Sequence, residues 1–288
     1  MLEPTSNQYI SARLKLHYVE WRNEGAPVLL LIHGRMDHCR SWDWVARQLA
    51  PRFHIIAPDL RGHGDSDWAI GNAYSMYDYV YDLMELVDQL KLEKLSIIAH
   101  SLGGGIATKY AGVCPAKVSQ LVSIEGLGSA PAMLAKEAAM STAEQMQSLA
   151  KQFQRLATKP LREFATEETA IVRMQQANGH LSEERARHLA LCGIRKNQAG
   201  KFCWKYDPYV GVHPPFDMSA KDSRELWSNI VCPLLLVWGQ ESWASDPVED
   251  GRIKFFQNAQ AVNIPGAGQW VHHDQFELFM EVVNKFLE

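Results

Sequence analysis

Short runs of consecutive apolar residues recur along the chain, each bounded by polar or turn-forming residues. Three of these runs, at 28–32, 95–99 and 234–238, lack helical periodicity. A fourth, at 118–125, is also mostly apolar. Strands buried on both faces of a parallel sheet show this continuous pattern, so we expect four such strands.

Segments with helical periodicity lie between the first two of these runs, at 41–50 and 75–90. The second carries four apolar or aromatic residues spaced three or four apart, which we expect to pack into the core. These residues are Tyr77, Tyr81, Met84 and Val87. Strands that alternate with helices indicate a doubly wound α/β sheet with right-handed crossovers.

The same alternation is predicted at the end of the chain, with a helix at 248–256, a short strand at 261–264 and a final helix at 275–287. Near the start, 9–14 and 16–21 have the pattern of an antiparallel hairpin, which we place at the edge of the sheet.

After 118–125 the alternation stops for about a hundred residues that are rich in good helix formers. We therefore divide the chain into a core, residues 1–125 and 231–288, and an inserted helical subdomain, residues 126–230. The inserted subdomain holds 14 basic and 11 acidic residues, a balance too even to indicate the charge of a substrate.

Composition narrows the class of protein. Of the 288 residues, 47% are hydrophobic and 22% charged, as in an ordinary globular protein. The 29 basic and 33 acidic residues leave no excess of positive charge for nucleic acid or an anionic membrane. The five cysteines form no C-x-x-C pair, so we expect neither disulfides nor a metal site. With no apolar run of membrane-spanning length and no export signal, we expect a cytoplasmic protein.

The strongest chemical signal is Ala99-His100-Ser101-Leu102-Gly103, at the end of a predicted strand and the start of a predicted helix. A serine on so tight a turn takes a strained backbone conformation that exposes its hydroxyl above the sheet. Small residues two positions to either side avoid a clash, and Ala99 and Gly103 supply them. Ser101 is therefore the candidate nucleophile.

A second loop, beginning at His33-Gly34, follows the strand at 28–32. We expect it to direct the backbone amide of Arg35 or Met36 toward Ser101. Together with the amide of Leu102 at a helix N-terminus, such a donor would hold a developing oxyanion. His33 itself is expected to brace this loop and not to act as a base.

These motifs, with DLRGHGDS from Asp59, AHSLGG from Ala99 and VWG from Val237, resemble the α/β-hydrolase family in order and spacing. The resemblance implies a mostly parallel eight-stranded sheet with a helical cap inserted after the sixth strand. It also implies a serine hydrolase of esterase type that needs no cofactor, with nucleophile, acid and histidine in that order along the chain. Dehalogenases and epoxide hydrolases of this fold use an aspartate nucleophile, which Ser101 argues against.

The sequence departs from the family at the acid of the triad. The usual position, after the seventh strand, holds Ser242. Some members carry the acid at the end of the sixth strand, where this chain has Glu125. We favour Glu125, because an acid that ends an apolar strand is buried at a cost unless it has a partner. Glu241 and Asp246 remain alternatives, and we expect Glu125 to point toward residue 269 and accept a hydrogen bond from its amide.

The second departure concerns the base. The family's histidine belongs to a Gly-His-aromatic turn, and this chain has Gln269 there. A carboxamide forms hydrogen bonds but has no usable pKa near neutrality, so it cannot act as a general base. Three explanations compete: a replacement in an otherwise intact site, a natural member with another role, or His272 or His273 as the base. We expect the two histidines to lie at the surface or to cap a helix.

The sequence thus predicts an enzyme that hydrolyses an ester through a Ser101 acyl-enzyme and is strongly impaired as it stands. The alternatives are a cofactor-free dioxygenase-like enzyme and a non-catalytic ligand-binding member of the fold. The substrate is expected to be a small apolar or aromatic ester, because four aromatic residues gather late in the inserted subdomain. They are Trp204, Tyr206, Tyr209 and Phe216.

Overall fold

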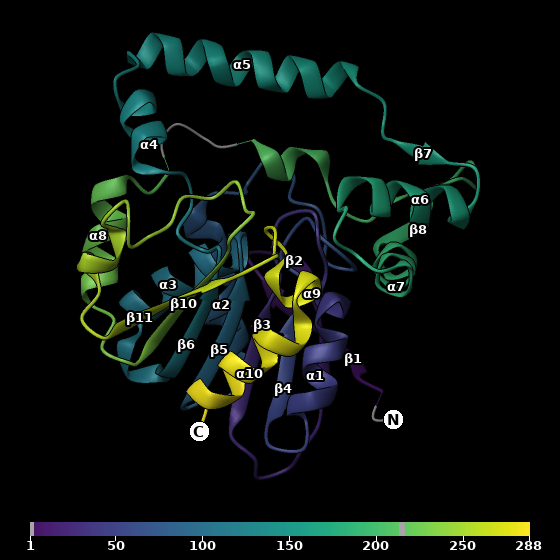
Figure 1. Cartoon of the computed structure of the whole chain (residues 1–288). Helices are drawn as coiled ribbons and strands as arrows, with labels where there is room; N and C mark the ends of the chain where they lie inside the picture. The colour runs from purple at the N-terminus through teal and green to yellow at the C-terminus, as the bar shows by residue number, and fades with distance from the viewer. Residues whose placement is uncertain (1–2, 213–216) are drawn as a thin grey trace.

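The protein is described by a computed structural model that covers residues 3–212 and 217–288 (Figure 1). An eight-stranded sheet crosses its centre in the order β1-β2-β4-β3-β5-β6-β10-β11. The strands are β1 (Thr5–Ser11), β2 (Leu14–Trp21), β3 (Val28–Ile32), β4 (His54–Pro58), β5 (Leu95–His100), β6 (Val118–Ile124), β10 (Leu234–Gly239) and β11 (Ala259–Ile264).

Six strands of this sheet run parallel to one another: β4, β3, β5, β6, β10 and β11. Strand β2 pairs antiparallel with both β1 and β4. The four predicted parallel strands and the edge hairpin are therefore confirmed. β3, β5 and β10 are almost entirely buried, which explains why their sequences are continuously apolar.

Helices cover both faces of the sheet and enclose two separate apolar cores. One face is covered by α2 (Met76–Gln89), α3 (Leu102–Val113) and α8 (Ala220–Ser228), and the other by α1 (Asp43–Leu49) and α10 (Phe276–Phe286). In Figure 1, α10 lies in front of the sheet and α3 on its far side. This is the doubly wound arrangement expected from the alternating sequence.

Two details of the prediction are wrong. Helix α2 buries Tyr79, Leu83 and Leu86, whereas Tyr77 and Tyr81 are 57% and 46% exposed and Met84 is also exposed. Of the predicted row only Val87 is buried. The helix expected at 248–256 is replaced by turns and the short 3-10 helix η4 (Arg252–Phe255).

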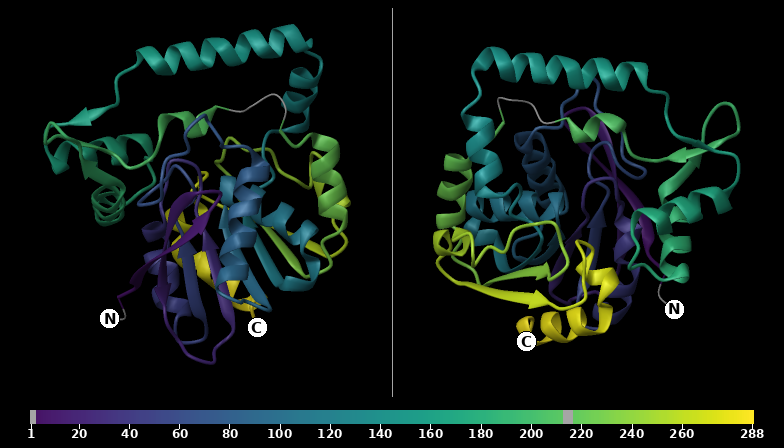
Figure 2. Two further views of the ribbon diagram at one scale, coloured as in Figure 1. Left: turned by 180° about the vertical axis from the view of Figure 1, so that it is seen from behind. Right: turned by 45° about the horizontal axis from the view of Figure 1, so that its top comes forward.

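The segment between β6 and β10 is mixed in structure rather than purely helical. Its helices are α4 (Pro131–Ala138), α5 (Thr142–Thr158), α6 (Glu167–Ala177), α7 (Glu183–Gly193) and α8. Three short strands form a second sheet in the order β7-β9-β8: β7 (Glu163–Phe164), β8 (Ile194–Lys196) and β9 (Phe202–Trp204). Figure 2 shows α5 spanning the top of the molecule in both views, whereas α8 packs directly against α3 of the core.

All five cysteines are free. Among the described residues, no helix combines the length and the apolar character needed to cross a bilayer.

Candidate active site

Ser101 lies in the sharp turn between β5 and α3. Its backbone has φ 50° and ψ −115°, a conformation that non-glycine residues rarely adopt. A Cβ atom at Gly103 would lie 2.5 Å from the carbonyl oxygens of both Ile32 and His33, so this position requires glycine. The strain and the close packing are those of a nucleophile elbow, which presents the Ser101 hydroxyl at the end of the sheet.

Gln269 lies directly against this hydroxyl. Its amide Nε2 donates a hydrogen bond to Ser101 Oγ at 3.2 Å. An amide nitrogen is a donor only, so it cannot receive the serine proton. The residue is thus positioned like a base while lacking the chemistry of one.

His100, the neighbour of Ser101, holds the loop that carries Gln269. Burial lowers the pKa of His100 to about 4, so the ring is neutral at pH 7. The backbone carbonyl of Gln269 can only accept a hydrogen bond, so His100 Nε2 carries the proton and donates to this carbonyl at 3.0 Å. Sequence reasoning missed this contact, because a histidine before the nucleophile gives no indication of its partner.

Glu125 follows β6 in a left-handed conformation with φ 54°. Its Oε1 accepts a hydrogen bond from the Gly239 amide at 2.8 Å, and its Oε2 is buried without a hydrogen bond among the described residues. Burial raises the pKa of Glu125 to about 7, although the Gly239 amide, the Ser242 hydroxyl and the Arg252 guanidinium oppose the rise. Gly239 in turn packs tightly on the Gly268 carbonyl, so Glu125 lies close to the loop of residue 269.

The hydrogen bond expected from Gln269 to Glu125 is not formed among the described residues, where the Gln269 amide nitrogen donates to Ser101. The alternative acids are engaged elsewhere. Glu241 Oε2 lies 3.6 Å from His180 Nε2, and Asp246 accepts hydrogen bonds from the amides of Val248 and Glu249. The choice of acid stays a prediction.

The loop expected to supply oxyanion donors borders the same site. Arg35, Met36 and Leu102 line the cavity that Ser101 and Gln269 share. His33 is completely buried, and its Nδ1 donates to the Gly34 carbonyl at 2.7 Å while its Nε2 accepts from the Leu60 amide at 3.0 Å. Burial lowers the pKa of His33 to about 3. Its bracing role is therefore confirmed.

The expectation that His272 and His273 lie at the surface is wrong. Both belong to the one-turn helix α9 (Val271–Asp274) and are 1% and 2% exposed. The His272 ring stacks on Trp42 with centroids 4.5 Å apart and lies 4.8 Å from the His100 ring. Burial lowers the pKa of both histidines well below the usual value. They pack as aromatic core residues behind the loop of residue 269.

A cavity of about 720 Å³ opens over Ser101 and Gln269, and Glu125 also lines it. Trp204 and Tyr206 form part of its wall, as the sequence predicted. Tyr209 packs against Phe153 of α5 instead, with ring centroids 5.8 Å apart. Phe216 lies outside the described residues. The sequence did not reveal that basic side chains line the cavity: Arg35, Lys109, Lys159, Arg162 and Arg173.

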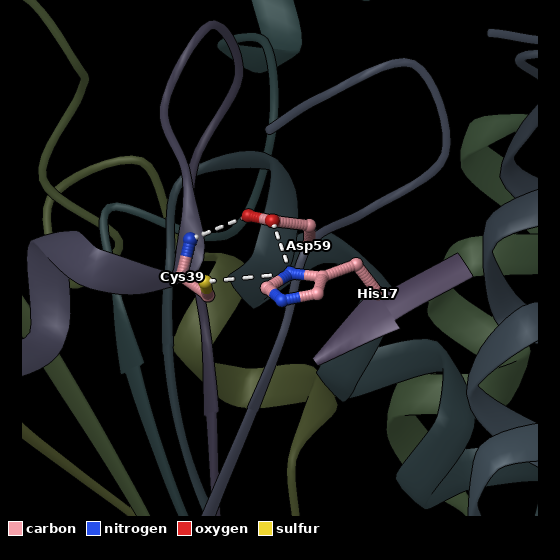
Figure 3. A group of neighbouring side chains, drawn as sticks. All are labelled: His17, Cys39 and Asp59. Carbon is pink, nitrogen blue, oxygen red and sulfur yellow. Dashed lines mark hydrogen bonds and ion pairs between the residues drawn. The ribbon is translucent and has the colours of Figure 1, made fainter. Parts of the chain in front are cut away.

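One group of metal-ligand types comes together in the part of the chain that the structure describes: His17, Cys39 and Asp59 (Figure 3). Asp59 already accepts three hydrogen bonds, from His17 Nδ1 at 2.7 Å, the Cys39 amide at 2.7 Å and the Asp65 amide at 2.9 Å. Burial raises the pKa of the Cys39 thiol, which opposes metal binding. The cluster is a hydrogen-bonded brace for the loops at Cys39 and Asp59.

Comparison with known proteins gives both partial and full-length matches. Uncharacterized proteins of Mycobacterium tuberculosis and Mycobacterium bovis are 41% identical over 102 residues, which is 35% of this chain and 30% of theirs. The chain thus spans under a third of these relatives. A putative 2-succinyl-6-hydroxy-2,4-cyclohexadiene-1-carboxylate synthase of Bacillus subtilis is 24% identical over 98% of both chains.

Among solved structures, the thioesterase domain from the curacin biosynthetic pathway superposes with a TM-score of 0.83 at 24% identity, covering 98% of this chain and 99% of that domain. At this identity the likeness shows the fold alone. A family model described as the alpha/beta hydrolase fold matches residues 27–276, nearly the whole chain. The chain belongs to the alpha/beta hydrolase fold family.

Proposed function

We propose that the site is built to hydrolyse a carboxylic ester through a Ser101 acyl-enzyme, and that glutamine at position 269 strongly impairs the step. The observation that carries the proposal is the 3.2 Å hydrogen bond between Gln269 Nε2 and Ser101 Oγ on a strained elbow. It puts residue 269 where a base would take the serine proton.

The remaining roles follow from the geometry around Ser101. The amide of Leu102, at the N-terminus of α3, and that of Arg35 or Met36 are proposed to hold the oxyanion. Glu125 is proposed as the acid that would orient a histidine at 269, because its unpaired Oε2 remains available as an acceptor. We further propose that residues 126–230 form the cap and that the bound ester lies against Trp204 and Tyr206.

A ligand-binding role is the second candidate, since Gln269 keeps Ser101 hydrogen-bonded while it removes the base. An ester assay separates the two. A panel of p-nitrophenyl esters is tested on this chain, on Gln269→His and on Gln240→His, which places a histidine on an exposed neighbouring loop position. We expect kcat/KM to rise about a thousandfold or more in Gln269→His alone. A folded Gln269→His protein with no gain contradicts the hydrolase proposal.

A further inference from the structure

Positive charge gathers around the cavity over Ser101. Five basic side chains line it, and among the described residues Glu125 is the only acid that does so. Burial raises the pKa of this one acid to about 7, so it is only partly ionised at neutral pH and cannot balance the five basic side chains. The cavity is therefore basic, although basic and acidic residues are nearly balanced over the inserted segment as a whole.

Lys109 is the most constrained of these cations. It projects from α3, the helix that begins beside Ser101, and is only 8% exposed. Within residues 3–212 and 217–288, its ammonium group has no ion pair and no hydrogen bond. The neighbouring Asp217 carboxylate is engaged by the amides of Met76 and Met218 at 2.7–2.9 Å. Burial lowers the pKa of Lys109 to about 8 and the Asp217 carboxylate opposes this change, so the ammonium group is mostly protonated at pH 7. Because it makes no hydrogen bond among the described residues, this side chain is suited to receive an anion.

Arg162 and Arg173 contribute from the inserted segment. Burial raises the pKa of Tyr206, and the charges of both guanidinium groups oppose this rise. The two arginines therefore lie near Tyr206, along the same wall of the cavity. Neither has an ion pair among the described residues. In contrast, the buried arginines Arg61 and Arg252 are each paired with a carboxylate, Asp82 and Asp250. The positive charges of Arg162 and Arg173 are therefore not balanced by a paired carboxylate among the described residues, and they can interact with a ligand in the cavity.

We propose that the substrate carries an anionic group, a carboxylate or a phosphate, which binds at Lys109 while its ester carbonyl lies at Ser101. Arg162 and Arg173 attract the same ligand from the inserted segment. The apolar remainder packs against the aromatic wall at Trp204. This inference rests on the proposed function for its ester, but the anion site itself requires only the cavity.

The test measures binding, because this chain with Gln269 is expected to leave an ester intact. Monomethyl glutarate and dimethyl glutarate, which differ by one negative charge, are titrated by calorimetry. We expect the monoanion to bind about tenfold more tightly than the neutral diester. Equal affinity for the two probes overturns the proposal. A phosphate-terminated ester of the same length, run beside the monoanion, identifies which anion the site prefers.

Variants locate the site. Lys109→Met replaces the ammonium group with an apolar chain of similar length, and we expect the preference for the monoanion to fall several-fold, leaving only the contribution of Arg162 and Arg173. The matched control is Arg187→Gln, an exposed arginine paired with Glu168 that does not line the cavity. It should keep the full preference. A preference that is unchanged in Lys109→Met contradicts the assignment.

A second variant tests the proposal even if Lys109→Met, at a buried position, fails to fold. Arg162→Gln/Arg173→Gln changes only the inserted segment, and we expect it to weaken monoanion binding several-fold while leaving diester binding unchanged. Unchanged monoanion binding in this variant contradicts the role of the arginine pair. The two proposals fail separately, because an anion preference without esterase activity in Gln269→His refutes only the hydrolase, and the reverse result refutes only the anion site.

Discussion

Gln269 and Ser101 are joined by a hydrogen bond in which the carboxamide donates to the hydroxyl oxygen at 3.2 Å. A general base would make the opposite contact, accepting the hydroxyl proton through a ring nitrogen. The glutamine therefore places a donor where catalysis needs an acceptor. Gln269 keeps the Ser101 oxygen hydrogen-bonded but lacks the atom that would accept the serine proton.

The direction of this hydrogen bond predicts how Ser101 reacts with an activated probe. We expect a fluorophosphonate to leave this chain essentially unlabelled and to modify Gln269→His at Ser101, because only a histidine accepts the serine proton. Peptide mapping by mass spectrometry identifies the modified residue. Ser101→Ala in the Gln269→His background should abolish labelling, and an adduct on Ser242 or Ser245 would refute the assignment.

The unpaired Oε2 of Glu125 predicts the identity of the acid. In the Gln269→His background, Glu125→Gln should lower kcat by about 10²–10⁴-fold, since the histidine loses the carboxylate that fixes its tautomer and stabilises its cation. Asp246→Asn is the matched control, because Asp246 only accepts hydrogen bonds from the turn that follows it. Steady-state kinetics that reverse this order would show that Asp246 is the acid.

Tight packing beneath the elbow predicts a stability effect. In Gly103→Ala the new methyl group would press on the carbonyls of Ile32 and His33, and we expect the free energy of unfolding to fall by about 2–3 kcal/mol. Gly179→Ala is the control, because no atom lies within 4 Å of a Cβ there and its φ is not in the left-handed region. Urea denaturation compares the two, and equal stability would show that the elbow accommodates the methyl group.

The buried rings of His272 and His273 predict sensitivity to mild acid. Burial lowers both folded-state pKa values below the usual 6.5. The unfolded chain therefore binds more protons below about pH 6.5, and stability is lost as the pH falls from there. His272→Phe keeps the stack on Trp42 but cannot be protonated. Denaturation curves at pH 7 and 5 should show a smaller loss for His272→Phe, and an identical loss would contradict the explanation.

The fold could be predicted largely from the sequence, because strands buried on both faces must be continuously apolar. Helix α2 could not be oriented in this way. Its sequence offers two partly apolar faces, and the buried one includes Asp82, which ordinary patterning assigns to the surface. Asp82 is buried because Arg61, distant in sequence, donates to both of its oxygens at 2.6 and 2.7 Å. Local periodicity contains no information about such a partner.

The predicted helix at 248–256 failed for a related reason. The side chains of Asp246 and Asp250 accept hydrogen bonds from backbone amides and so compete with helical backbone bonding, and Gly251 takes a left-handed φ of 77°. At the site, the elbow serine and residue 269 were recognisable because their motifs are local. The basic cavity was not, since Arg162 and Arg173 come from an inserted segment whose docking only the folded chain defines. Lys109 is recognisable in the sequence only as a charged residue among the mostly small or apolar residues of α3.

Asp59 has a consequence for the order in which the protein folds. Its carboxylate joins His17 of the N-terminal hairpin, the Cys39 amide beyond the Arg35 loop and the Asp65 amide of its own loop. The His17 contact forms only when β2 has paired with β4, which closes a long stretch of chain and costs conformational entropy. The loop that carries Arg35 should therefore be among the last parts to become ordered. During refolding, binding in the cavity should recover after the helical signal, and the lag should lengthen in Asp59→Asn.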